Sequence, residues 1–296
     1  MPYDLTNKLV IGVSSRALFD LEEENRIYEE KGLEEYTKYQ INNEEVSLKK
    51  GTAYPLIEGL LKLNEKIEPG LVEVIILSKN SPETGLRVFN TINSLGINIT
   101  RAVFSGGESL TRYLEPFQVD LFLSKNADDV QAAINAGVAA GIIYDPPEGF
   151  NPDTSELRLA FDGDAVLFSD ESEKIFQEQG LDAFEDHEKI NSKNALPEGP
   201  FAKLLKTISK IHAKETGQQY IRIAIVTARS SPAHKRVILT LREWGVKVDE
   251  AFFLGGISKD KILKAYNAHI FFDDQDTHLK GTREFVPSAK VPYRTK

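Results

Sequence analysis

The sequence contains no cysteine, so it has neither a disulfide framework nor thiolate chemistry, and a cytoplasmic protein is expected. It also lacks any apolar run near the roughly 20 residues of a membrane-spanning helix. The first residues lack the basic and apolar segments of a signal peptide. The net charge of -9 disfavours nucleic acid, whose binding depends on lysine and arginine contacts to phosphates. We therefore expect a globular protein that binds neither membranes nor nucleic acid.

Histidine is scarce, and its five copies show no pair at the spacing of zinc ligands. A small anionic substrate is still compatible with the acidic chain, because a bound Mg²⁺ reverses the local field. The histidines are His187, His212, His234, His269 and His278.

Short apolar runs alternate with helical patterns, which predicts an α/β fold of parallel sheets flanked by helices, built from two Rossmann-like units. A segment rich in Pro, Gly and Asp at 145–153 is the expected linker, so the units comprise residues 1–148 and 154–296. An amphipathic helix is expected at 52–67. Strands are expected at 8–13, 71–77, 97–104, 120–123 and 141–144 in the first unit and at 157–161, 221–226 and 270–272 in the second.

The pattern of the first half returns after the linker. Gly32-Leu33 matches Gly180-Leu181 at a separation of 148 positions, and Phe104 to Gly107 matches Phe253 to Gly256 at a separation of 149. Agreement in the same order over so long a span predicts an internal duplication.

Two carboxylates follow the expected strand at 157–161, in the sequence Asp162-Gly163-Asp164. Placing them together at the end of a buried strand is costly without a cation, and Mg²⁺ is the natural partner for carboxylates and phosphate oxygens. An aspartate can also attack phosphorus, and a second one can act as general acid and base. Because turns are rich in Asp and Gly, this motif alone is a weak signal.

Three further elements of the second half each end a strand or begin a helix. Thr227 can bind a phosphate oxygen, Lys259 after Gly255-Gly256 can offset phosphoryl charge, and Asp273-Asp274 can hold the metal. Taken singly, Thr227 could be a helix N-cap, Lys259 a solvated lysine and the Asp pair a turn. Together, in this order, they indicate a phosphoryl-transfer site with Mg²⁺.

The order Asp-x-Asp, Thr, Lys, Asp-Asp resembles the haloacid dehalogenase superfamily of aspartate-nucleophile phosphotransferases. More narrowly, the chain resembles the cytosolic 5'-nucleotidase type I family over nearly its whole length. The motifs that carry this resemblance are VSSRALFD, KGLEEYTKYQ and Ser105-Gly106-Gly107 in the first half, and FDGDAVLFSDESE, DHEK at 186–189, VTARS and HIFFDDQ in the second.

The resemblance implies Mg²⁺-dependent hydrolysis of nucleoside 5'-monophosphates such as AMP to nucleoside and phosphate. Asp162 would then form the aspartyl-phosphate, and Asp164 would protonate the leaving oxygen and activate water. Thr227 and Lys259 would bind the phosphoryl group, with Gly163 and Ala228 lining the substrate site. The expected metal set is Asp162, Asp164, Asp273 and Asp274.

Two alternatives stay open. A phosphatase of another small ester, such as a sugar phosphate, would share the same core residues. A protein of another class, a catalytically silent nucleotide-binding protein, would retain the scaffold without the chemistry. A homo-oligomer is also among the arrangements that the sequence leaves open.

The segment at about 169–214 is expected to be a cap insertion that meets the nucleoside. Phe176, Phe184 and His187 are candidates for base contact. For both phenylalanines the spacing favours core packing, and for His187 a solvated position is equally compatible.

At the matching positions the first half has hydroxyls and cations in place of the carboxylates. This set could form a basic pocket for a nucleotide effector such as ADP or ATP, while the alternative is a relic retained for packing. Its members are Ser14, Arg16, Ser78, Lys79, Ser124 and Lys125.

Overall fold

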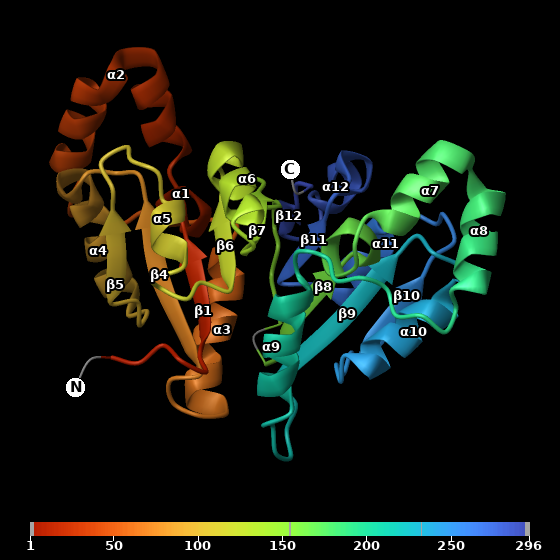
Figure 1. Cartoon of the computed structure of the whole chain (residues 1–296). Helices are drawn as coiled ribbons and strands as arrows, with labels where there is room; N and C mark the ends of the chain where they lie inside the picture. Colours follow the sequence, from red (N-terminus) through yellow and green to blue (C-terminus); the bar gives the residue numbers. More distant parts are fainter. Residues whose placement is uncertain (1–2, 154, 232, 294–296) are drawn as a thin grey trace.

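The computed structural model describes residues 3–153, 155–231 and 233–293, and within them ten strands form one sheet (Figure 1). The strand order is β10-β9-β8-β11-β12-β7-β6-β1-β4-β5. A separate antiparallel pair joins β2 (Phe19–Asp20) to β3 (Lys49–Lys50). The strands of the large sheet are β1 (Leu9–Val13), β4 (Val72–Ser78), β5 (Arg101–Phe104), β6 (Leu121–Ser124), β7 (Ala139–Ile143), β8 (Leu157–Phe161), β9 (Ile221–Thr227), β10 (Glu250–Phe253), β11 (Ile270–Asp273) and β12 (Ser288–Lys290).

Helices connect successive strands, except between β7 and β8, which confirms the predicted α/β fold. Among the described residues, no helix is both long and apolar enough to cross a membrane. The helices are α1 (Ser15–Leu18), α2 (Glu22–Asn42), α3 (Tyr54–Lys66), α4 (Pro82–Leu95), α5 (Thr111–Leu114), α6 (Ala127–Asn135), α7 (Glu171–Gln179), α8 (Leu181–Ile190), α9 (Ala202–His212), α10 (His234–Glu243), α11 (Asp260–Tyr266) and α12 (Asp276–Thr282).

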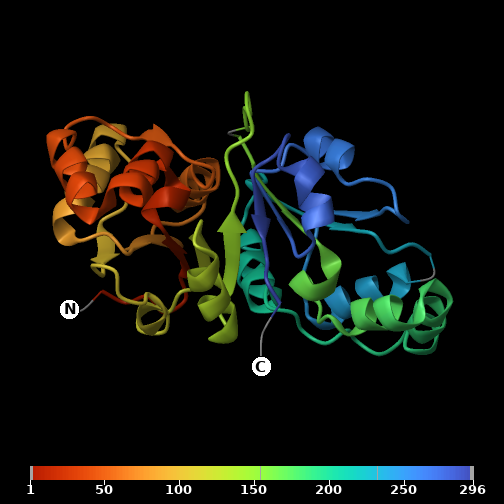
Figure 2. The ribbon, with the colours of Figure 1, turned by 90° about the horizontal axis from the view of Figure 1, so that it is seen from above.

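Every pair of neighbouring strands in the large sheet is parallel except β7 and β12, which pair antiparallel. This pair joins the two halves into one continuous sheet, where the sequence predicts a separate sheet in each unit. Viewed from above, the halves lie side by side and meet at a narrow waist formed by β7 and β12 (Figure 2). The segment 145–153 leaves this waist and leads into β8.

The two halves have the same strand order, β5-β4-β1-β6-β7 and β10-β9-β8-β11-β12. Their backbones also agree in detail: Gly32 breaks α2 with φ 82° and ψ -178°, and Gly180 separates α7 from α8 with φ 83° and ψ -176°. At spacings of 149 and 148, Arg87 donates to Gln40 at 3.1 Å in the first half, and Arg236 donates to Glu188 at 2.8 Å in the second. The repeat in the sequence therefore corresponds to a repeat in local structure.

One expected strand is shorter than predicted. Residues 97–100 precede β5 but are not part of it, because their backbone donors are used locally. Ile97 N–H donates to the Ile92 carbonyl of α4, and Ile99 N–H donates to the Ile97 carbonyl within the loop. These bonds use donors that a strand would give to its neighbour.

The predicted cap segment at 169–214 contains two different kinds of helix. The α7–α8 hairpin projects from the sheet (Figure 1), whereas α9 packs on it through Leu204, Leu205 and Ile208, all buried. The amphipathic pattern of α9 thus makes it a layer helix, the counterpart of α3. Within the segment 169–214, only the α7–α8 hairpin lies away from the sheet.

Candidate active site

Three of the four aspartates singled out in the second half, Asp162, Asp273 and Asp274, meet where β8 and β11 end. These parallel strands pair Phe161 with Phe272, and the Asp162 N–H donates to the Phe272 carbonyl at 2.8 Å. The next residues, Asp162 and Asp273, therefore emerge side by side, at the carboxyl ends where open α/β sheets bind ligands. We call Asp162, Asp273 and Asp274 the carboxylate cluster; all three are at most 5% exposed.

Lys259 ties two members of this cluster together. Its Nζ lies 2.9 Å from Asp162 Oδ1 and 2.7 Å from Asp273 Oδ2, and the side chain is buried. The lysine reaches this place because Gly255 and Gly256 form the turn ahead of it at φ 56° and 88°, a left-handed region that favours glycine. The sequence predicted Lys259 at the site, and the turn at Gly255 and Gly256 brings its ammonium group to the carboxylates.

Asp274 is held differently, by Tyr293 near the end of the chain, whose hydroxyl donates to Asp274 Oδ2. Its other oxygen, Oδ1, is buried and has no hydrogen-bond partner among the described residues. A buried, unpartnered carboxylate oxygen is costly unless a further ligand meets it.

The electrostatics of the cluster favour a cation. Burial, followed by the neighbouring acidic charges, raises the pKa of Asp162 to about 7 and that of Asp274 to about 8, although Lys259 opposes the rise for Asp162. Burial alone would also raise the pKa of Asp273, but Lys259 and His278 lower it overall. Oxygens of Asp162 and Asp273 and a ring nitrogen of His278 lie within 4.8 Å of one another. Three buried carboxylates facing one lysine suit a hard divalent ion such as Mg²⁺.

Asp164 does not join the cluster through any described contact; it is paired with Arg229. Arg229 donates from Nη2 to Asp164 Oδ1 at 2.6 Å and from Nε to Oδ2 at 2.7 Å. After Asp164 the chain turns sharply, with Ala165 at φ 60°, which is uncommon for a residue with a side chain. The same Arg229 binds Glu188 of α8 through Nη1. Arg229 was missed as a site residue, although it stands within the VTARS motif two positions after Thr227.

Thr227 ends β9 beside the Asp162–Asp164 loop, as predicted from its position. A side chain at Gly163 would place its Cβ 3.3 Å from Thr227 Oγ1, so glycine allows this close approach. Thr227 Oγ1 accepts a hydrogen bond from the Arg229 N–H at 3.2 Å, which is a cap-like contact. Ala228, between them, is exposed.

The aromatic candidates lie on the α7–α8 hairpin. Core packing was wrong for Phe176, which is 45% exposed, because the hairpin projects from the sheet instead of packing on it. Phe184 is partly buried and covers Arg229, whose guanidinium carbon lies 5.3 Å from the ring centroid. His187 lies between carboxylates, with Nδ1 3.4 Å from Glu188 and Nε2 3.6 Å from Glu171. Phe184 is thus linked to Asp164 through Arg229.

In the first half, the corresponding residues follow the ends of β1, β4 and β6, but every cation already has a carboxylate partner. Arg16 binds Glu22, and Lys79 binds Asp129 at 2.8 Å. Lys125 lies 2.7 Å from both Glu22 and Asp145 and is 10% exposed in its side chain. The hydroxyls of Ser15 and Ser78 meet at 3.0 Å, while Ser14 and Ser124 accept hydrogen bonds from local backbone N–H groups. These pairings favour packing over anion binding; an effector there stays a prediction.

Fold and site together define an α/β protein with a buried, lysine-bridged carboxylate cluster at the ends of parallel strands. The sequence model of the family described as 5'-nucleotidase matches residues 1–296. The cytosolic 5'-nucleotidase 1B of Homo sapiens is 35% identical over 302 aligned positions, which cover 98% of this chain and 50% of that protein. The chain therefore belongs to the 5'-nucleotidase family.

The chain spans about half the length of this curated relative. No solved structure matches it.

Proposed function

We propose that this protein hydrolyses nucleoside 5'-monophosphates such as AMP, in the presence of Mg²⁺, to nucleoside and phosphate. The observation that carries the proposal is the convergence of Asp162, Asp273, Asp274 and Lys259, with Thr227 on the neighbouring strand, in a chain of the 5'-nucleotidase family.

Asp162 is the proposed nucleophile. The described contacts of its carboxylate, to Lys259 and to the Gly163 N–H at 2.7 Å, all involve Oδ1. Oδ2 is then the oxygen that attacks phosphorus, as the bond between phosphorus and the 5'-oxygen breaks. Asp164 gives a proton to that 5'-oxygen. In the second step Asp164 takes a proton from water, whose oxygen attacks the aspartyl-phosphate, releasing phosphate and restoring Asp162.

Lys259 and the Thr227 hydroxyl hold the phosphoryl oxygens, with Gly163 and Ala228 around them. Asp162, Asp273 and Asp274 would hold Mg²⁺, together with Asp164, and the unpartnered Oδ1 of Asp274 supports this assignment. The ion supplies positive charge for the phosphoryl oxygens in the transition state.

Three further assignments complete the proposal. The two halves descend from an internal duplication, because strand order and backbone detail agree, and the first unit has lost its carboxylates. The α7–α8 hairpin acts as a cap, with Phe184 and His187 nearest the nucleoside. The protein acts in the cytoplasm, as the absence of cysteine favours and as the name of the human relative says of that protein.

The test is phosphate release from AMP, with and without Mg²⁺, in the wild type, Asp162→Asn and Asp170→Asn. Asp170, paired with Lys174 just beyond the loop, is the matched control. We expect Mg²⁺-dependent release that falls by at least about 10³-fold in Asp162→Asn and stays near wild type in Asp170→Asn.

A panel of IMP, CMP, dTMP, a sugar phosphate and p-nitrophenyl phosphate separates the alternatives. Preference for the sugar phosphate would replace the nucleotide assignment. No release from any ester, with ADP or ATP added, would reject the enzyme and favour a silent nucleotide-binding protein.

A further inference from the structure

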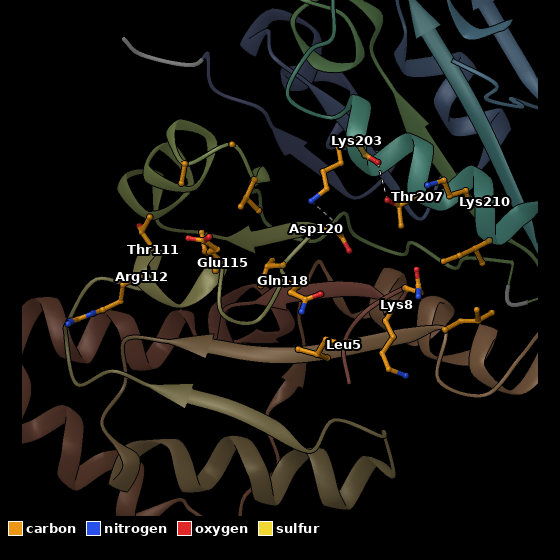
Figure 3. A pocket seen from close by; sticks show the side chains of 18 of the residues that line it. Leu5, Lys8, Thr111, Arg112, Glu115, Gln118, Asp120, Lys203, Thr207 and Lys210 are labelled. Carbon is orange, nitrogen blue, oxygen red and sulfur yellow. Dashed lines mark hydrogen bonds and ion pairs between the residues drawn. The ribbon is translucent and has the colours of Figure 1, made fainter. Parts of the chain in front are cut away.

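A cavity of about 1040 Å³ lies between α9 of the second half and the strands of the first half (Figure 3). Its other wall is formed by the segments 5–8, 111–120 and 136–138, which lead into β1, β6 and β7. None of its lining residues belongs to the carboxylate cluster or contacts it in the described structure. Its size suits a ligand as large as a nucleotide.

The side chains that line this cavity have a positive net charge, opposite in sign to the net charge of the chain. Its lining carries two carboxylates and five cationic side chains, whereas the whole sequence has a net charge of -9. A concave surface of one sign concentrates ions of the other sign, so the cavity attracts anions. The cations are Lys8, Arg112, Lys203, Lys210 and Lys214, and the carboxylates are Glu115 and Asp120.

Helix α9 supplies the cations in a row. Lys203, Thr207 and Lys210 are spaced by four and three residues, so they share one face of the helix and project toward the cavity (Figure 3). Lys214 continues the row just past the helix end. At 1.5 Å per residue, Lys203 and Lys210 lie about 10 Å apart along the helix axis, with the Thr207 hydroxyl between them. Because the row extends over about 10 Å, a chain of phosphates contacts more of it than a single phosphate does.

Two of the five cations have carboxylate partners outside the lining: Lys214 binds Glu68 at 2.8 Å and Arg112 binds Glu108 at 2.6 Å. Lys203 and Lys210 are not neutralised by close ion pairs of this kind. Lys203 is 76% exposed in its side chain and has only a long contact of 3.6 Å to Asp120. No carboxylate in the described part of the chain is within ion-pair distance of Lys210. Asp120 already has a structural contact, because its Oδ2 accepts a hydrogen bond from the Val10 N–H at 3.0 Å. Burial also raises the pKa of Asp120, which weakens its hold on Lys203.

We propose that this cavity binds a linear polyphosphate anion, with Lys203 and Lys210 as its main contacts. The phosphate chain comes either from an inorganic polyphosphate or from a nucleotide. In the second case Gln118, whose amide lies on the opposite wall, is placed to meet the nucleoside (Figure 3). Such a ligand touches both halves of the molecule at once.

The experiment is isothermal titration calorimetry of the full chain, free of Mg²⁺, with inorganic tripolyphosphate and, separately, with ATP. The test variant is Lys203→Ala/Lys210→Ala, and the matched control is Lys206→Ala. Lys206 lies on the same helix but outside the lining, where it binds Glu198 and covers Trp244. Each lost charge-assisted contact should weaken binding by about tenfold or more, while Lys206→Ala stays within about twofold of wild type. Unchanged melting curves show that the variants fold.

Equal affinity for the two probes would show that the phosphate chain is the recognised group, and tighter binding of ATP would add the nucleoside; both support the proposal. Failure of both probes to bind at millimolar concentration overturns it. So does binding that is kept in the double variant but lost in Lys259→Ala, which would place the anion in the carboxylate cluster instead.

Discussion

Arg229 holds Asp164 by two parallel hydrogen bonds, from Nη2 to Oδ1 at 2.6 Å and from Nε to Oδ2 at 2.7 Å. The third nitrogen of the same guanidinium binds Glu188 on α8, and Glu188 also binds Arg236 at 2.8 Å. The proposed general acid is thereby connected to the hairpin that projects over the strand ends. The four charged side chains of this network are buried or nearly buried, so replacing one of them should measurably change activity or stability.

Replacing Arg229 by lysine should lower kcat for AMP by about 10²-fold, with a smaller change in KM. Lysine keeps the buried charge but cannot form two parallel bonds, so Asp164 loses its orientation, and general acid–base catalysis is worth about 10² to 10⁴. Steady-state kinetics of phosphate release measure this. Arg222→Lys on β9, the strand that leads to Arg229, is the control and should change little; its arginine binds Glu156 and Glu250. An unaltered kcat in Arg229→Lys would show that Asp164 does not need Arg229.

Replacing Glu188 by glutamine should destabilise the fold by about 3 kcal/mol or more. The carboxylate is fully buried between two guanidinium groups. Removing its charge leaves the buried Arg236 without this carboxylate partner and Arg229 with Asp164 alone. Urea unfolding followed by circular dichroism measures the change. Glu178→Gln, an exposed position on α7, should stay within about 0.5 kcal/mol of wild type. Equal stability of the two variants would contradict a structural role for the Arg229–Glu188–Arg236 network.

Mg²⁺ should bind more tightly as the pH rises through 7 and 8. The pKa of Asp162 is raised to about 7 and that of Asp274 to about 8, so at lower pH these carboxyls carry protons that a cation must displace. Calorimetry of the metal-free protein should show affinity at least about tenfold higher near pH 8.5 than near pH 6, with protons released on binding. Asp274→Asn should flatten this dependence. An affinity that does not change with pH would contradict the proposed ligands.

Acid should destabilise the protein partly through His269. Burial, followed by the nearby charge of Arg158, lowers the pKa of this histidine to about 4. Between pH 6.5 and 4 the unfolded chain therefore binds a proton that the folded chain does not, so stability falls as the pH falls. From pH 7 to 5 this costs about 2 kcal/mol.

The variant His269→Asn tests this, because its amide oxygen can still accept from the Arg158 N–H, as Nδ1 does at 3.2 Å, but cannot be protonated. Its loss of stability between pH 7 and 5, measured by urea unfolding, should be smaller than that of wild type by about 2 kcal/mol. Identical losses would assign the acid sensitivity to other groups.

The sequence by itself determined the α/β class and the places where the functional residues stand. Strand and helix patterns are local, and residues that end parallel strands meet at one edge of the sheet whatever the rest of the chain does. This is why Asp162 and Asp273, more than one hundred positions apart, could be expected side by side. The repeat could also be recognised from local sequence, because glycines recur at matching positions in the two halves.

Only the tertiary structure decided which charges pair and how the halves join. Asp164 with Arg229, Asp274 with Tyr293, β7 with β12, and the lysine face of α9 with the first half are all contacts between distant segments. No local pattern encodes such contacts, because each depends on how helices and strands pack in three dimensions. Phe176 shows the same limit: its helical spacing was read correctly, but the surface that would bury it is absent from the hairpin's surroundings in the described structure.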